Sequence, residues 1–137
     1  MEAGKSADFH GHMPGHGIEQ SDAEQAYCQS LLGGTEPWVT LPKDRWPASW
    51  AKKGFKSPIC PLRFALYGHP DAGGYWEKHC ETHVKSVGFQ HVTDWRSCFW
   101  QPKLELFLVV YVDDFKLAGP KGRLAGGWKL IRSGIET

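Results

Sequence analysis

The feature that most constrains the fold is a pair of adjacent carboxylates, Asp113 and Asp114, at the meeting point of two strand-like runs. Residues 104–110 before the pair are mostly apolar and β-prone, and residues 115–118 after it precede a Gly-Pro break. The pattern predicts a β-hairpin whose first strand is apolar enough to lie at the centre of a sheet. A hairpin turn ordinarily carries Asn-Gly or Asp-Gly, so two aspartates bring no advantage in turn geometry.

Adjacent carboxylates repel each other unless a cation neutralises them. A divalent metal bound at Asp113 and Asp114 is therefore the simplest explanation of the pair. A solvated acidic turn is the alternative, because aspartate is common in turns. We favour the metal site, since an apolar run precedes the pair and Tyr111 and Phe115 flank it.

Composition sets the class of protein. The chain has 137 residues, of which 41% are hydrophobic and 13% aromatic, enough for one domain with a sizeable core. Sixteen basic and fifteen acidic residues leave a formal charge of +1, so any contact with nucleic acid has to come from a local patch. Apolar runs fall short of the ~18 residues that span a bilayer, and residues 1–17 do not resemble a signal peptide. We expect an intracellular protein with no membrane partner.

The first half of the chain has few regular patterns. Residues 1–17 contain four glycines and no apolar periodicity, which predicts a flexible N-terminal segment. Ser21 and Glu24 fit a capping box that would open a short helical segment. Residues 35–61 predict an irregular connection with one short strand at residues 38–41.

The second half predicts most of the regular structure. Helical spacing of Trp76, Cys80, Val84 and Val87 predicts a helix over residues 75–86 with one buried face. Further along the chain we expect a strand within residues 92–100 and a helix within residues 124–131. Together these elements predict an α+β fold, an antiparallel sheet centred on the hairpin at residues 104–118 with helices packed on one face.

Two further groups of side chains suggest binding sites. Lys52, Lys53 and Lys56 alternate with aromatic residues, a pattern suited to phosphate contact and base stacking, and a solvated loop is an equal alternative. His79 and His83 lie four residues apart on the predicted helix, a spacing that can hold zinc. Cys80 stands where the metalloprotease pattern has a glutamate and the sequence offers no obvious third ligand, so we do not expect zinc at this pair. The four cysteines lie singly, with no Cys-x-x-Cys pair, and are expected to be reduced.

Two-metal nucleotidyl transfer would need a third carboxylate facing the hairpin, and Asp22 is the candidate. It could equally be a helix N-cap. Tyr27 lies five residues further on, an aromatic that would share its side, although a tyrosine in such a segment often belongs to the core.

Three motifs, at residues 20–27, 66–76 and 109–114, occur in the order seen in one polymerase family. Over roughly residues 18–132, with 133–137 as a C-terminal tail, the chain resembles the reverse transcriptase of copia-type LTR retrotransposons. The resemblance implies a partial right-hand polymerase palm. It also implies that Asp22, Asp113 and Asp114 are catalytic and hold two Mg²⁺ (or Mn²⁺) ions. Asp22 and Asp113 would be the direct ligands, with Asp114 supporting them.

The resemblance also implies substrate contacts. Tyr27 would be the aromatic gate that excludes a ribonucleotide 2′-hydroxyl. The incoming triphosphate would lie against Ala23, Glu24, Gln25 and Ala26. The stretch at residues 66–74 would lie near the nucleotide and template. Over residues 69–74 this chain lacks a basic residue and an amide of the family and has a carboxylate, Asp71, a change that weakens contact with phosphate or template.

The function implied is RNA-directed DNA polymerisation, from a dNTP to a primer 3′-hydroxyl on an RNA or DNA template, in a cytoplasmic retrotransposon particle. With few residues before Asp22 and after Asp114, we expect a polyprotein fragment that is weak or inactive alone and is completed by the remaining polyprotein segments. One alternative is a non-catalytic palm remnant that binds nucleic acid or protein. Another is a small metal-binding structural protein that uses His79, His83 and a cysteine.

Overall fold

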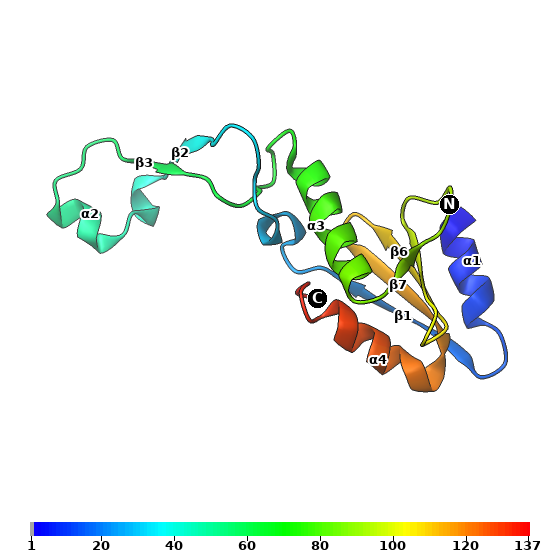
Figure 1. Cartoon of the computed structure of the whole chain (residues 1–137). Coiled ribbons are helices and arrows are strands. Elements are labelled where there is room, and N and C mark those ends of the chain that lie inside the picture. The colour runs from blue at the N-terminus through cyan, green and yellow to red at the C-terminus, as the bar shows by residue number, and fades with distance from the viewer. Residues whose placement is uncertain (1) are drawn as a thin grey trace.

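A computed structural model describes residues 2–137, and Met1 lies outside the described residues. Within this range the chain forms an α+β fold around a five-stranded antiparallel sheet in the order β1-β7-β6-β5-β4 (Figure 1). The α+β class and the antiparallel sheet expected from the sequence are confirmed. The strands of the sheet are β1 (His16–Asp22), β4 (Gln90–His91), β5 (Cys98–Gln101), β6 (Leu106–Tyr111) and β7 (Asp114–Pro120).

The β6–β7 hairpin is central, as its sequence predicts. Side chains of a strand alternate between the two faces of its sheet, and Leu106 and Leu108 point to one face while Phe107 and Val109 point to the other. Helices cover both faces, which explains why β6 is an almost continuous apolar run rather than an alternating one. The strand expected within residues 92–100 is shorter and later, because β5 begins at Cys98.

Helices α3 (Ala72–Ser86) and α4 (Lys121–Ile131) cover one face and form the main core with it (Figure 1). The predicted buried positions Trp76, Cys80 and Val84 are at most 3% exposed. Their partners from the sheet and from α4 are Phe99, Leu106, Leu108, Phe115, Leu117, Leu124, Trp128 and Ile131. None of the helices in residues 2–137 has the length and apolar character needed to cross a membrane.

Helix α1 (Glu2–Gly11) packs on the opposite face, so the helices are not confined to one face as expected (Figure 1). The described part of the segment predicted to be flexible is therefore largely helical. Ala7 is fully buried, in a small cluster with Cys98, Val109 and Ala118. A helix that docks through alanine and glycine leaves no run of large apolar residues in the sequence, which is why no periodicity was visible.

Strand β1 corrects the expected helix start at Ser21. The chain stays extended through Asp22, and a 3₁₀ turn, η1 (Ala26–Gln29), follows. Ser21 pairs with Phe115, so the β7 ladder satisfies backbone groups that a capping box would otherwise serve. The mostly polar side chains of β1 suit its position at the edge of the sheet.

A two-stranded ribbon leaves the body of the protein as an arm (Figure 1). It consists of β2 (Trp38–Thr40), as predicted, and β3 (Ile59–Pro61), which the sequence did not indicate. Between them lie η2 (Lys43–Arg45) and α2 (Ala48–Lys52). Trp38 and Ile59 are each 57% exposed, so the ribbon has little core of its own.

Adjacent glycines on α4 test the packing of that helix on the sheet. A Cβ on Gly127 would meet Leu106 and Leu117 side-chain atoms at 2.4 and 2.9 Å, whereas a Cβ on Gly126 would meet only Leu104 at 3.8 Å. Gly127→Ala should lower the free energy of unfolding by about 1–3 kcal/mol through overpacking. Gly126→Ala should raise it by up to about 1 kcal/mol through helix propensity. Urea unfolding of both variants checks the pair, and equal effects would contradict this packing.

Candidate functional site

The register of the sheet brings two of the predicted catalytic carboxylates together. Asp22, the last residue of β1, lies directly opposite Asp114, the first residue of β7. Asp114 also pairs with Tyr111 at the end of the hairpin. Because directly opposed residues of an antiparallel pair project to the same face, the Asp22 and Asp114 side chains share the face on which α1 packs.

The turn of the hairpin consists of Val112 and Asp113. Val112 has a φ of +56°, a conformation that is rare for a β-branched residue. Glycine would relieve this backbone at no steric cost. Strained backbone of this kind persists where the surroundings fix it, and it is concentrated at functional sites.

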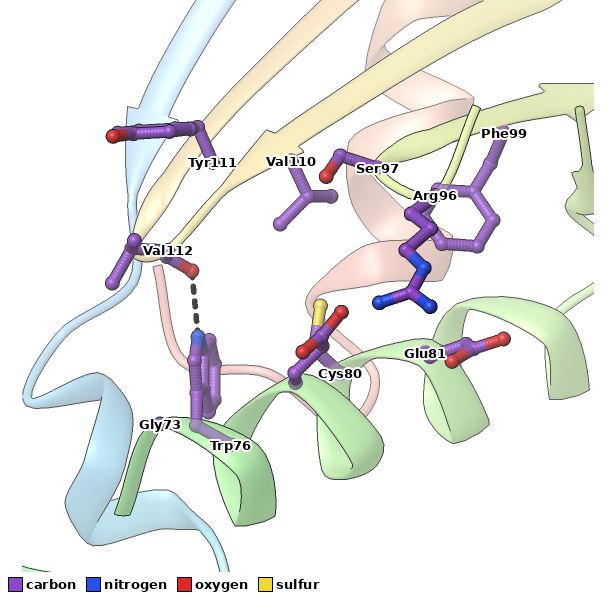
Figure 2. Close-up of a pocket in the computed structure, with 11 residues that line it drawn as sticks. Gly73, Trp76, Cys80, Glu81, Arg96, Ser97, Phe99, Val110, Tyr111 and Val112 are labelled. Carbon is purple, nitrogen blue, oxygen red and sulfur yellow. Dashed lines mark hydrogen bonds between the residues drawn. The ribbon is translucent and has the colours of Figure 1, made fainter. Parts of the chain in front are cut away.

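Two hydrogen bonds hold the strained turn from opposite sides. The Ala23 amide donates to the Asp113 carbonyl at 2.7 Å. The Trp76 Nε1 donates to the Val112 carbonyl at 2.6 Å, the bond drawn in Figure 2. Trp76 therefore joins helix α3 to the turn as well as filling the core. The sequence indicated only the core role of Trp76. The available signal was its indole N–H, a donor that needs a partner when the ring is buried.

The pKa of the Asp114 carboxyl is raised, first by loss of water and then by the neighbouring carboxylates. Partial removal of water raises the pKa of its carboxyl above the usual 3.8, and a hydrogen-bonding contact with Asp22 and the charges of Asp22 and Asp113 raise it further. Asp113 thus acts on the pair through its charge. A raised pKa means that the site favours a proton, or another positive charge, between the two carboxylates.

This chemistry fits a hard divalent cation, which prefers carboxylate oxygens and would offset the repulsion between them. Asp22 and Asp114 are the two side chains that the fold brings together for such an ion. In residues 2–137 no group of three or more His, Cys, Asp or Glu side chains is placed to hold a metal ion. The three predicted ligands are therefore near one another without forming a closed coordination group.

Cavities lie on both sides of the hairpin. On the carboxylate side, a cavity of about 450 Å³ is lined by Asp22, Asp114, Gln20, Lys116 and the first turn of α1. On the other side, a cavity of about 250 Å³ lies between α3 and the strands, where Arg96 reaches toward Glu81 (Figure 2). Burial raises the pKa of the Cys80 thiol in its wall to about 12, and Glu81 and Glu77 add to the rise. A thiol held protonated in this way is a poor nucleophile at neutral pH.

The predicted substrate-binding residues divide by exposure. Ala23 and Ala26 are buried, 5% and 1% exposed, and Glu24 and Gln25 lie on the surface. Tyr27 is half-buried, and its ring lies 4.6 Å from that of Tyr67, centroid to centroid.

Other predicted binding residues lie away from the carboxylates. Asp71 is exposed, directly before the first residue of α3. Lys52, Lys53 and Lys56 are exposed at the far end of the arm, which extends away from the sheet (Figure 1).

The histidine pair on α3 does not form a zinc site with a third ligand in the described part of the chain. His83 Nε2 lies 2.9 Å from the Ile131 carbonyl, which ties α3 to the end of α4. His79 Nε2 is buried and has no hydrogen-bond partner among residues 2–137.

Comparisons with protein-family models, curated proteins and solved structures give no match to this chain.

Replacing Trp76 by Phe removes the indole donor while keeping an aromatic ring in the core. With the Val112 carbonyl released, the turn should loosen, and the Ala23 amide that donates to Asp113 should exchange its hydrogen about fivefold faster, the effect of one net hydrogen bond. Amide exchange measured by NMR tests this. Trp128→Phe, in the same core on α4, is the control and should leave Ala23 exchange unchanged after correction for global stability.

Removing the charge of Asp114 should stabilise the protein in a pH-dependent way. A pKa raised in the folded state favours folding below the unfolded pKa near 3.8, and this contribution disappears as the pH rises through the folded pKa. At pH 7 the melting temperature of Asp114→Asn should therefore exceed that of the wild type by about 1–3 °C, scaled down for an exposed group. The difference should vanish below pH 3.8. Asp94→Asn, on a loop, should show no such trend in thermal melts.

Proposed function

We propose that this chain is part of the palm of a copia-type reverse transcriptase and that its reaction is two-metal nucleotidyl transfer from a dNTP to a primer 3′-hydroxyl. One observation carries the proposal: Asp22, expected from the sequence to be the third carboxylate, lies opposite Asp114 across the β1–β7 ladder. If Asp22 were only a helix N-cap and Asp114 only part of a solvated turn, nothing would require the two residues to pair in the sheet. The hairpin and the three motifs in their order add support.

In this proposal Asp22 and Asp114 hold the divalent ions, with Asp113 beside them. This exchanges the roles that the resemblance implies for Asp113 and Asp114, because Asp114 is the residue directly opposite Asp22. When bound, Mg²⁺ would lower the pKa of the primer hydroxyl and neutralise the triphosphate. The protein's own contribution is position. The Ala23 amide and the Trp76 indole hold the turn, so that the carboxylates are fixed before substrate arrives and little reorganisation is needed during the reaction.

For the nucleotide, we infer a role for the pair of contacting rings of Tyr27 and Tyr67. Their rings are 4.6 Å apart at an interplanar angle of 35°. Tyr67 would hold the Tyr27 ring in place, and a ring so held can exclude a 2′-hydroxyl by contact. The Tyr27 hydroxyl also lies near the first turn of α3, 4.0 Å from where a Cβ on Gly73 would be.

For the template strand, the arm is the proposed contact. Residues 43–56 hold five basic side chains and one acidic side chain, although the whole chain has a formal charge of only +1. Trp50 lies between Trp46 and Phe55, with ring centroids 6.1 and 6.2 Å away. Positive charge interleaved with aromatic rings suits a flexible strand, because phosphates and bases are bound together.

A non-catalytic nucleic-acid-binding remnant is the second candidate. It is favoured by the absence, within residues 2–137, of a group of three side chains placed to hold a metal ion. The two candidates differ in one requirement. Catalysis needs the carboxylates, whereas binding through the arm does not.

The test is primer extension on a poly(rA) template with an oligo(dT) primer, measured with strand binding in the same samples. Asp22→Asn should reduce Mg²⁺-dependent incorporation by about a hundredfold or more, because several kcal/mol of charge stabilisation is lost. Glu19→Gln is the matched control on the same strand, since Glu19 is exposed on the other face of β1. Strand binding without extension in the wild type would favour the non-catalytic candidate, and equal extension by Asp22→Asn would refute the assigned site.

A further inference from the structure

Helix α1 lies on the same sheet face as the carboxylates. The register places Asp22 opposite Asp114, Gln20 opposite Lys116 and Ile18 opposite Ala118, and all six side chains project to that face. Ala118 and Ala7 of α1 are both fully buried in the contact. The helix therefore covers one end of this face, and the carboxylates lie at the other end.

The boundary between the covered and open parts is the cavity beside the carboxylates. Its lining includes Ala3 and Gly4 of α1 together with Asp22, Asp114 and Lys116. The helix thus forms one wall of the space that a ligand of the carboxylates would enter. A long ligand such as a nucleic-acid strand would meet α1 if it continued along the sheet.

The contact that holds α1 is made by small side chains, with His10 adding an edge contact to the Trp100 ring and a hydrogen-bonding contact of 3.2 Å between its Nε2 and the Glu105 carbonyl. It offers the sheet mainly alanine and glycine, while its one large apolar residue, Phe9, is 78% exposed. Elements with few buried apolar contacts are the ones that open locally at low cost in free energy. A removable helix is consistent with this packing.

Lys116 is the cation nearest to the carboxylates on its strand, two residues after Asp114 and on the same face. Its Nζ lies 2.9 Å from a carboxylate oxygen of Asp8 on α1, with 23% of the lysine side chain and 48% of the aspartate side chain exposed. Asp8 thus places an anion on the lysine that lines the carboxylate cavity. A phosphate group carries the same charge and accepts the same hydrogen bonds.

We propose that Lys116 binds a phosphate group of the nucleic-acid or nucleotide ligand, and that helix α1 occupies this position with Asp8 until the ligand displaces it. The inference rests on the proposed function in taking the ligand to be a strand or a triphosphate. It adds a phosphate-binding residue and an autoinhibitory contact at the same face. Docking of α1 and phosphate binding at Lys116 exclude each other, because the Asp8 carboxylate and the phosphate would occupy the same position beside the lysine ammonium group.

The test compares Asp8→Asn, Lys116→Gln and the double variant, using fluorescein-labelled oligo(dT) in fluorescence anisotropy titrations. Because EDTA removes any metal from the carboxylates, titrations in EDTA and in Mg²⁺ separate this proposal from the metal chemistry. Asp8→Asn should bind about two- to fivefold more tightly than wild type in both buffers, the effect of releasing a half-exposed ion pair. Asp94→Asn makes the same change in net charge elsewhere and should not reproduce the gain.

Lys116→Gln distinguishes the release of helix α1 from the binding of phosphate by Lys116. It too should release α1, seen as faster amide exchange in residues 5–11, but without tighter binding. The dependence of binding on salt, as log Kd against log salt concentration, should be shallower by about 0.7 in Lys116→Gln than in Asp8→Asn, the contribution of one phosphate contact on a single strand. The double variant should behave like Lys116→Gln.

Amide exchange in α1, measured with oligo(dT) and separately with dTTP, identifies the source of the phosphate. If oligo(dT) speeds exchange in α1 and dTTP does not, the ligand is a strand; the reverse result indicates the triphosphate. Three results would overturn the proposal: unprotected α1 amides in the wild type, unchanged or weaker binding by Asp8→Asn, or equal binding by Asp8→Asn and Lys116→Gln. Failure of primer extension alone would leave these binding results standing and would count only against the polymerase reaction.

Discussion

Backbone pairing between β1 and β7 joins parts of the chain that are far apart in sequence, and the candidate site depends on it. The ladder runs from His16 opposite Pro120 to Asp22 opposite Asp114. A slip of one residue would move Asp22 to the other face of the sheet, away from Asp114. The register is supported by what packs at the far end, where Ile18 and Ala118 meet α1. The acidic pair is thus placed by apolar contacts several residues away.

The backbone and the charges of the candidate site are unfavourable by themselves, and contacts with the rest of the fold keep the site in place. Partial loss of water and the neighbouring carboxylates raise the pKa of Asp114, and the turn between the strands places Val112 at a positive φ. Both features cost free energy. The Trp76 indole and the Ala23 amide counter this cost from the core and from the edge strand. Such an arrangement is expected where function, rather than stability, selects the residues.

The sequence predicts the elements that are encoded by neighbouring residues, and it does not predict the contacts between residues that are far apart in the chain. The hairpin, α3 and α4 are encoded by neighbouring residues, through apolar runs and helical spacing, and the structure contains all three. Strand β1 was missed because an edge strand needs no apolar run, and Ser21 and Glu24 imitate a helix start. Helix α1 was missed because alanine and glycine docking leaves no periodicity. Helical spacing predicts that Trp76 lies in the core, but it does not predict the hydrogen bond to Val112, which depends on how α3 packs against the hairpin.

The distance in sequence between β1 and β7 also sets an order of events during synthesis. Strand β1 emerges from the ribosome before the arm and α3, whereas its partner in the sheet, β7, ends at Pro120. The β6–β7 hairpin can close as soon as it emerges, because its strands are adjacent, whereas β1 must wait unpaired through the whole arm and α3. Waiting strands are liable to pair with other chains. The polar run Glu19, Gln20 and Ser21 makes β1 a poor template for such pairing, so the composition that hid the strand in the sequence protects the nascent chain.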